Sequence, residues 1–225
     1  MTIFLQKDKL QEYKGWMLPT YCDHFHSTID SGMKNYYQTK CDDTVFSNTP
    51  NKNLAIDIGG NIGLMARRYA EVFDHVHTFE PVLENYSCLY YNTKELDNIT
   101  LYPIGLGEEE KQETILLPKN ASSCGDWSIV DFINTKESTR SFTIDIRTLD
   151  SFNLKPDFIK IDIQGYELSV LKGATETLKK YKPTLLIETV SAGKNISTHV
   201  AEFIDQFGYK QIKKINKDRI YKVYE

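Results

Sequence analysis

Several features that would indicate particular classes of protein are absent from this sequence. Its four cysteines, Cys22, Cys41, Cys88 and Cys124, are widely spaced and form no C-x-x-C pair, which argues against a zinc site or a thioredoxin-like redox motif. No apolar run approaches the ~20 residues of a membrane-spanning helix, and the first residues lack the apolar segment of a signal peptide. We therefore expect a cytoplasmic protein in a reducing compartment.

Clustered positive charge is also missing. The 225 residues carry 27 Lys and Arg against 31 Asp and Glu, for a formal net charge of −4. Binding to nucleic acid needs Lys and Arg gathered on one surface. The most basic stretch, Lys210–Lys222, has the alternation of the solvent face of a hairpin. We expect a small-molecule or glycan partner, and neither nucleic acid nor a membrane span.

The chain contains no internal repeat and no low-complexity segment. Its composition, 40% hydrophobic and 26% charged, is typical of a soluble globular protein. The length suits one α/β domain with a short extension. We expect an N-terminal extension over residues 1–52, partly helical and covering the cleft, followed by a single domain over 53–225.

From residue 54 onward, short apolar runs alternate with helical patterns. Leu54–Ile58 is a near-continuous apolar run, which is typical of a strand buried on both faces. Further strands are predicted at 76–79, 99–104, 158–163 and 184–189, with helices at 62–73, 83–96, 167–180 and 200–207. Strands at 113–117 and 141–146 interrupt the alternation, and 209–215 with 220–224 predict a terminal hairpin. This order predicts an α/β fold with a mostly parallel, doubly wound sheet and helices on both faces.

A glycine-rich loop joins the first strand of this sheet to the first helix. It contains Asp57, Gly59, Gly60, Asn61 and Gly63. Glycines allow a tight turn and let a ligand lie against the backbone, and the helix start offers free N–H groups. We expect the loop to bind a cofactor, and Gly59→Val to abolish that binding while the protein still folds.

Two acidic residues indicate which cofactor this loop binds. Asp57 directly precedes the glycines, where a carboxylate would repel a dinucleotide pyrophosphate but would favour the cationic groups of S-adenosylmethionine (SAM). Glu80 ends the second strand, where an acid can accept hydrogen bonds from ribose hydroxyls. NAD sites share the second feature, and a nicotinamide dehydrogenase remains an alternative, although the loop lacks the G-x-G-x-x-G spacing.

Several sequence blocks resemble the FkbM-type SAM-dependent methyltransferases. These blocks are Ala55–Gly63 (AIDIGGNIG), His77–Pro81 (HTFEP), Thr148–Asp150 (TLD), Ile159–Ala174 (IKIDIQGYELSVLKGA) and Pro183–Glu188 (PTLLIE). Together they span residues 54–190. The resemblance implies a Rossmann-like class I methyltransferase sheet of seven strands in the order 3-2-1-4-5-7-6, with strand 7 antiparallel. It also implies O-methylation of sugars or other small molecules.

The resemblance further assigns cofactor contacts. Gly59, Gly60 and Gly63 would border the methionine part of SAM, and Glu80 would hold the ribose. The adenine would lie beside Ile104 and Gly105. Many family members carry V-E-G where this chain has Ile163-Gln164-Gly165, so a base or metal-ligand role for that Glu would be lost here.

Residues at the ends of the fourth and fifth sheet strands are the catalytic candidates. The enzyme must align the acceptor and help to remove its proton, and ligands of open α/β sheets bind at the carboxyl ends of the strands. Asp162 and Gln164 end the fourth strand, and Glu188 ends the fifth. Asp162 is a candidate to bind the SAM ammonium or to orient the acceptor, and Glu188 is a candidate base. A third metal ligand is not evident, so we predict no metal site.

Other candidates and functions remain open. His24, His26 and His199 are secondary candidates for a base, and the loop 122–127, which contains Trp127, is a candidate wall of the cleft. The alternative functions are methylation of nitrogen or of a protein side chain, and SAM binding without catalysis.

Overall fold

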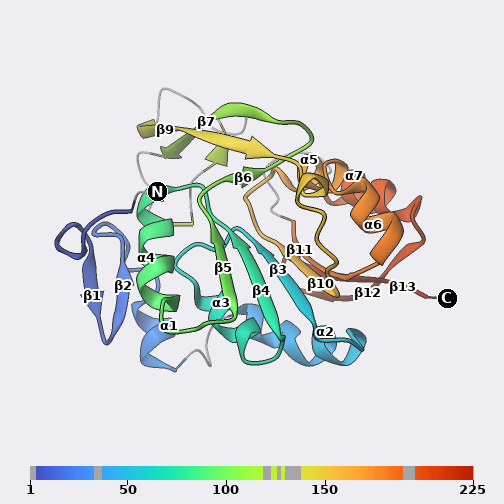
Figure 1. The fold of residues 1–225 in the computed structure, drawn as a ribbon, viewed down its shortest axis with the longest axis horizontal. Helices are drawn as coiled ribbons and strands as arrows, with labels where there is room; N and C mark the ends of the chain where they lie inside the picture. The colour runs from blue at the N-terminus through green and yellow to red at the C-terminus, as the bar shows by residue number, and fades with distance from the viewer. Residues whose placement is uncertain are drawn as a thin grey trace.

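The computed structural model describes residues 4–32, 37–118, 123–125, 128–129, 138–189 and 196–224. The described residues form one central sheet, flanked by helices, and a second, smaller sheet beside it (Figure 1). The strands of the central sheet are β3 (Leu54–Ile58), β4 (His75–Phe79), β5 (Ile99–Tyr102), β10 (Phe158–Ile161), β11 (Thr184–Glu188), β12 (Tyr209–Ile215) and β13 (Asp218–Val223).

The central sheet has the order β12-β13-β11-β10-β3-β4-β5. Numbered along the chain, its strands follow the order 3-2-1-4-5-7-6. Strands β5, β4, β3, β10 and β11 are parallel, and β13 is antiparallel to both β11 and β12. The predicted α/β class and terminal hairpin are thus confirmed.

Helices cover both faces of this sheet because alternate strand residues on each face are apolar. One face packs on α5 (Glu167–Lys172), α6 (Thr175–Tyr181) and α7 (Ile196–Asp205) through residues such as Ile56 and Ile159. The other face packs on α2 (Asp42–Asn48) and α3 (Leu64–Ala70) through Ala55, Phe158 and Leu186. Asp57 and Lys160 each lie two residues after a member of the second set, so both belong to the face under α2 and α3.

The helix predicted at 167–180 is instead two helices, α5 and α6, which meet at Gly173. A Cβ on Gly173 would lie 1.9 Å from the backbone oxygen of Gly107. This close contact between the two glycines coincides with the break between α5 and α6, and hydrophobic periodicity does not reveal it. The helix predicted at 62–73 begins later, at Leu64, because Gly63 has the left-handed φ of +92°.

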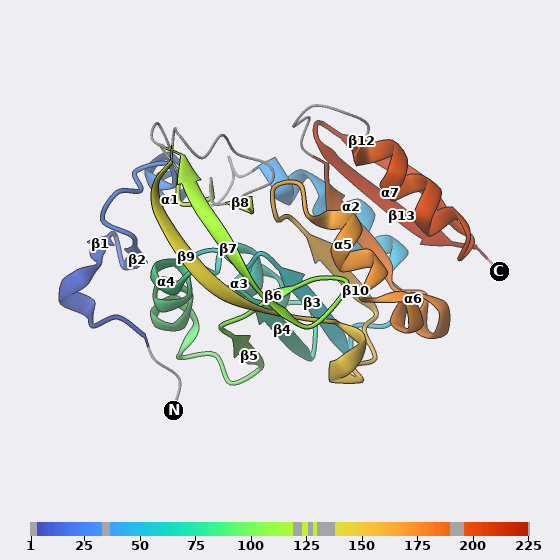
Figure 2. The same ribbon diagram turned by 90° about the horizontal axis from the view of Figure 1, so that it is seen from above.

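The second sheet has the order β6-β9-β7-β8 and lies beside the central sheet (Figure 2). Its strands are β6 (Gly105–Leu106), β7 (Lys111–Pro118), β8 (Ser128–Ile129) and β9 (Ser138–Arg147). The strands predicted at 113–117 and 141–146 are confirmed as parts of β7 and β9, which pair antiparallel. The strand predicted at 99–104 ends at Tyr102 because Gly105 already pairs with Ile146 of the second sheet.

The N-terminal segment packs on the domain through a hairpin and two helices. Strands β1 (Gln11–Tyr13) and β2 (Trp16–Leu18) form the hairpin, which lies against α4 (Leu83–Thr93). The side chain of Asn92 on α4 accepts a hydrogen bond from the backbone N–H of Met17 at 2.7 Å and donates one to its carbonyl at 2.9 Å. Helices α1 (His26–Asp30) and α2 follow. A boundary at residue 52 remains a prediction.

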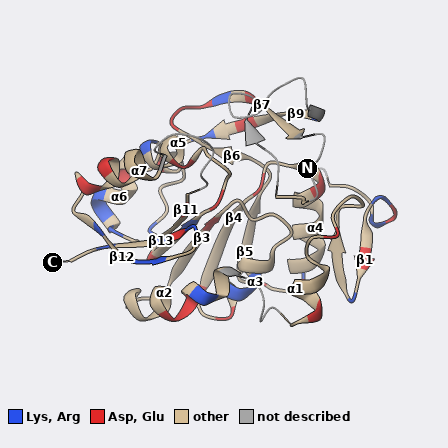
Figure 3. Ribbon diagram, turned by 180° about the vertical axis from the view of Figure 1, so that it is seen from behind, with Lys and Arg blue, Asp and Glu red and all other residues tan. Residues whose placement is uncertain are grey.

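Charged residues are distributed over many elements. Segments with Lys and Arg alternate with segments with Asp and Glu in the view of Figure 3. Among the described residues, no helix is both long enough and apolar enough to cross a membrane.

Candidate active site

A cavity of about 530 Å³ lies at the carboxyl ends of the parallel strands, between the central sheet and the second sheet. Its position follows from the parallel topology, which brings the ends of β3, β4, β10 and β11 to one edge. Nine of the predicted site residues line it, namely Gly59, Gly60, Asn61, Glu80, Ile104, Gly105, Asp162, Gln164 and Glu188. Asp57 and Gly63 do not belong to its lining.

The glycines of the loop are required mainly by contacts within the protein. A Cβ on Gly59, whose φ is +84°, would lie 2.0 Å from the backbone oxygen of Asp162, and one on Gly60 would lie 2.2 Å from Thr78 Oγ1. A Cβ on Gly63 would lie 2.8 Å from Leu89. The expectation that Gly59→Val leaves the fold intact is therefore wrong, because the added side chain would collide with the end of the neighbouring strand.

Asp57 lies beneath the glycine loop and is paired with a buried lysine. Lys160 Nζ is 3.0 Å from Asp57 Oδ1 and donates a hydrogen bond to the backbone oxygen of Gly59 at 2.9 Å. Both side chains are buried, Asp57 completely. Burial lowers the pKa of Lys160, but the carboxylates of Asp57 and Asp162 outweigh it and raise the pKa above its usual value. Lys160 is therefore a fixed positive charge that positions the glycine loop. Asp57 affects the loop through its ion pair with Lys160.

Asp162 and Glu188 form a pair of carboxyl groups at the wall of the cavity. The two side chains hydrogen-bond to each other. Burial alone would raise the pKa of Asp162, but the Lys160 ammonium, 3.9 Å away, and the surrounding hydrogen bonds hold the pKa below its usual range. The lowered pKa favours the ionised form of Asp162.

Two glutamine side chains orient the Asp162 carboxylate. Gln38 Nε2 donates a hydrogen bond to Oδ2 at 2.8 Å, and Gln164 Nε2 donates one to Oδ1 at 3.2 Å. Gln164 has a left-handed φ of +55°, so the chain turns sharply directly after the strand. The neutral residue at 164 is therefore a hydrogen-bond donor to the acid beside it.

Glu80 follows β4 and turns its carboxylate toward the glycine loop. It accepts hydrogen bonds from the backbone N–H groups of Asn61 at 2.8 Å and Val82 at 2.9 Å. Burial outweighs these bonds and raises the pKa of Glu80 to about 7. The acid is held in one orientation at the cavity, yet it is easily neutralised in the free protein.

The cavity wall from the second sheet is mostly apolar. Ile104, Gly105 and Ile146 line this side, and a Cβ on Gly105 would lie 2.6 Å from Ile146 Cδ1. Asn85, on α4, also lines the cavity and donates from Nδ2 to the backbone oxygen of Cys124. Its buried Oδ1 finds no hydrogen-bond partner among the described residues. An apolar slot with one unsatisfied acceptor suits a flat heterocycle that carries a donor.

The sequence alone did not identify three residues of the site. Lys160 is a single lysine within an apolar strand, and that isolation is a usable signal because a buried charge requires a partner. Gln38 belongs to a segment without clear periodicity, and Asn85 lies within a helix, so neither gave a signal.

The secondary candidates divide between the cavity and other places. His24 and the segment 123–125 line the cavity, His26 is not among its residues, and His199 is exposed on α7. Trp127 lies outside the described residues. The described residues contain no group of three acidic, histidine or cysteine side chains that could hold a metal ion.

The sheet order, the glycine loop and the cavity at the strand ends together define a class I methyltransferase fold. Residues 57–211 match the model of the FkbM methyltransferase domain. Because the match covers more than half of the chain, the protein belongs to the FkbM methyltransferase family.

Solved structures have the same fold. Methyltransferase FkbM from Methylobacillus flagellatus KT aligns with a TM-score of 0.51 at 22% identity, over 76% of this chain and 43% of that protein. The ribosomal protein L11 methylase from Lactobacillus delbrueckii subsp. bulgaricus aligns with a TM-score of 0.51 at 9% identity, over 84% of this chain and 80% of that one. The chain thus spans less than half the length of the M. flagellatus protein. A comparison with curated proteins found no match.

Proposed function

We propose that this protein transfers a methyl group from SAM to a hydroxyl group of a small polar acceptor, such as a sugar. The observation that supports this most strongly is the Asp162–Glu188 carboxyl pair, in which Glu188 is buried and Asp162 partly buried, and which lies at a cavity large enough for a cofactor and part of an acceptor. When bound, SAM supplies a methyl group already activated on a sulfonium.

The residues at the cavity fit SAM. Glu80 is oriented to accept hydrogen bonds from the ribose hydroxyls, as acids at this position of nucleotide-binding sheets do. Ile104 and Gly105 offer an apolar wall to the adenine, and Asn85 Oδ1 is a free acceptor for its amino group. The Asp162 carboxylate is a suitable partner for the ammonium group. Asp57 supports the site indirectly, through Lys160.

The chemistry of this chain concerns the proton of the acceptor. A hydroxyl group beside the carboxyl pair donates a hydrogen bond to Asp162 and passes its proton to the pair as the oxygen attacks. Gln38 and Gln164 keep the carboxylate in one orientation, and Lys160 keeps it ionised. Alignment of the oxygen with the methyl group supplies the rest of the rate enhancement.

Other acceptors define the alternatives. Methylation of nitrogen or of a protein side chain, and SAM binding without catalysis, use the same cofactor half of the cavity. The carboxyl pair favours hydroxyl methylation because a hydroxyl must lose a proton on transfer. A small acceptor, rather than nucleic acid, and a cytosolic location complete the proposal. It is supported by the net charge of −4 and by four cysteines that are free thiols.

Calorimetry with SAM, and separately with NAD, tests the cofactor. Glu80→Ala removes the hydrogen bonds to ribose and is expected to weaken SAM binding by about 2–3 kcal/mol, roughly 30- to 150-fold in Kd. The matched control is Glu95→Ala, which removes an acid whose side chain is 84% exposed and should leave Kd unchanged. If Glu80→Ala binds SAM within threefold of wild type, the ribose assignment is wrong.

Turnover tests the carboxyl pair. A search for products about 14 Da heavier, in an extract incubated with enzyme and SAM, identifies an acceptor. With that acceptor, Asp162→Asn is expected to lower kcat by about 10²-fold, the scale of a lost general base. A fall in SAM affinity with unchanged kcat would instead assign Asp162 to the ammonium group. Unchanged kcat and KM would exclude Asp162 from the reaction and leave Glu188 as the candidate.

A further inference from the structure

Three of the four cysteines lie together, and the proposed reaction uses none of them. Cys22, Cys88 and Cys124 belong to one buried hydrophobic cluster, in which the N-terminal segment packs against α3 and α4. Cys41 lies in a separate cluster under α2. All four are buried free thiols.

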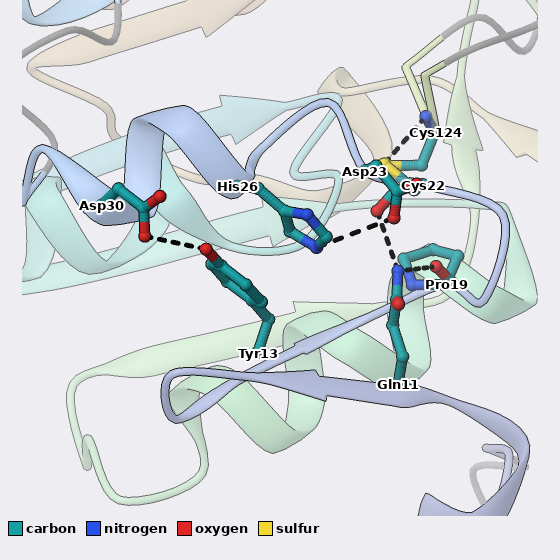
Figure 4. Close-up of polar contacts among 8 residues, drawn as sticks. All are labelled: Gln11, Tyr13, Pro19, Cys22, Asp23, His26, Asp30 and Cys124. Carbon is teal, nitrogen blue, oxygen red and sulfur yellow. Dashed lines mark hydrogen bonds and ion pairs between the residues drawn. The ribbon is translucent and has the colours of Figure 1, made fainter.

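Two of these cysteines are in direct contact through their sulfur atoms. Cys22 Sγ and Cys124 Sγ are 2.7 Å apart, although the residues are 102 positions apart in the sequence (Figure 4). Cys22 lies between the hairpin and α1, and Cys124 lies in the segment 123–125. A disulfide bond requires sulfurs about 2.05 Å apart, so a small movement of the side chains suffices.

Hydrogen bonds to their backbone groups hold both cysteines in place. The carbonyl of Cys22 accepts a hydrogen bond from Gln11 Nε2 at 2.9 Å, and the same Nε2 donates to the carbonyl of Pro19 at 3.0 Å (Figure 4). The carbonyl of Cys124 accepts a hydrogen bond from Asn85 Nδ2 at 2.8 Å, and its N–H donates to Cys22 Sγ at 3.2 Å. The contact between the sulfurs is thus built into the packing.

Cys124 connects this cluster to the candidate active site. The residue lines the cavity, and its thiol donates a hydrogen bond to Asn61 Oδ1, 3.3 Å away. Asn61 belongs to the glycine loop and donates its backbone N–H to Glu80. The sulfur pair thus adjoins the cavity through Cys124, and because both side chains are fully buried, a small oxidant reaches them only when the cavity wall opens.

The two sulfurs differ in reactivity. The hydrogen bond between the two sulfurs lowers the pKa of Cys22 more than burial raises it. Burial raises the pKa of Cys41 to about 12 and that of Cys124 well above its usual value. The thiolate is the reactive form of cysteine, so Cys22 is the nucleophile of the pair and Cys124 the residue that resolves it.

We propose that Cys22 and Cys124 form a reversible disulfide site, with a peroxide as the oxidant. The Cys22 thiolate attacks one oxygen of hydrogen peroxide, the O–O bond breaks, and hydroxide leaves and takes up a proton to become water. The Cys124 thiolate then attacks the sulfur of the resulting sulfenic acid and displaces a second hydroxide, which becomes water. Two thiols and one peroxide give one disulfide and two waters, and an external thiol reverses the oxidation.

This bond would join the N-terminal segment to the wall of the cavity. It would also remove the thiol hydrogen that Cys124 donates to Asn61. A coupling to the cofactor follows, and this step alone rests on the proposed function: bound SAM covers the path from the cavity to the sulfurs. At a SAM concentration of about 100 times its Kd, only about 1% of the protein is free, so oxidation is expected to be about 100-fold slower.

The experiment treats the reduced protein with hydrogen peroxide and then alkylates the remaining thiols under denaturing conditions. The expected result is a fall from four alkylated cysteines to two, restored by dithiothreitol, with one disulfide-linked peptide pair that contains Cys22 and Cys124. Four remaining thiols, or a linked pair that includes Cys88, would overturn the proposal.

Variants provide the controls. Cys41→Ser and Cys88→Ser are expected to lose two thiols each, as the wild type does, whereas Cys22→Ser and Cys124→Ser are expected to lose none to a disulfide. Peptide mapping of the wild type decides the matter if a variant does not fold. If calorimetry shows that SAM binds and the oxidation rate is nevertheless unchanged, the cavity is not the path. If SAM does not bind while the disulfide forms, the proposed function fails and the disulfide site stands.

Discussion

Replacement of Lys160 by methionine tests the charge arrangement beneath the glycine loop. Lys160 is 3% exposed and lies 3.0 Å from Asp57 Oδ1, so its removal leaves a buried carboxylate without its cation. Loss of one partner of a buried ion pair typically costs about 3–5 kcal/mol. The hydrogen bond to the Gly59 carbonyl adds about 1 kcal/mol. We therefore expect the free energy of unfolding to fall by about 4 kcal/mol or more at pH 8.

A matched surface pair serves as the control. Lys172 and Glu108 are separated by 2.9 Å, nearly the same distance, but their side chains are 40% and 54% exposed. Exposed pairs contribute about 0–1 kcal/mol, so Lys172→Met should change stability little. Urea unfolding followed by circular dichroism measures both variants. The expected difference in stability between the two variants comes from the depth at which each ion pair is buried, because the two pairs have nearly the same length.

The double variant Asp57→Asn, Lys160→Met decides whether the pair is the cause. Replacing both charged partners removes the unpaired charge, so the double variant should be more stable than Lys160→Met alone by at least about 2 kcal/mol. The loss in Lys160→Met should also shrink at pH 5, where Asp57 can be neutralised by a proton. If the two effects simply add and do not depend on pH, the reasoning is refuted.

Three further predictions concern pH and packing. Because the pKa of Glu80 is about 7 in the free protein and SAM favours its ionised form, SAM affinity should rise about tenfold from pH 6 to pH 8, and Glu80→Gln should abolish this dependence in calorimetry. Asp218 is buried and its pKa is raised to about 7, so its ionisation destabilises the folded protein fully above pH 7 and not below about pH 4. Asp218→Asn should therefore raise the free energy of unfolding at pH 8 by up to about 4 kcal/mol, and should leave it unchanged at pH 4. Melting curves at the two pH values measure this difference. Gly15 and Gly59 share a φ of +84°, but only a Cβ at Gly59 would meet another atom. Gly59→Ala should therefore lower the free energy of unfolding by about 3 kcal/mol or more, and Gly15→Ala by about 1 kcal/mol. Equal losses on urea unfolding would contradict the clash with Asp162.

Much of the fold follows from the sequence because the parallel strands are continuous apolar runs. Leu54–Ile58 and Phe158–Ile161 could be recognised as strands from these runs, and the resemblance to the FkbM family placed them next to each other. Acids that directly follow such strands must lie at the same edge of the sheet. Glu80, Asp162 and Glu188 were predicted in this way, and all three line one cavity.

The features that escaped prediction depend on contacts between distant residues. Gly173 divides one periodic helix into two because it touches Gly107. Gln38 reaches Asp162 from 124 positions away in the sequence. Asp57 was predicted to face the cofactor, but strand alternation places it against Lys160, beneath the loop. Local patterns identify which residues end a strand, whereas only packing determines what each side chain meets.

The second sheet gives the chain an exchangeable part. The excursion leaves the central sheet at Gly105 and returns at Ile146, and these two residues pair in parallel, so the segment begins and ends at one place. Such a segment can lengthen, shorten or be replaced while the central sheet keeps its register. Because β7 and β9 supply one wall of the cavity through Ile115, Ile144 and Ile146, substitution of this segment would reshape the pocket and leave the glycine loop intact. The glycine loop, which the central sheet holds, is thereby insulated from changes in this wall of the cavity.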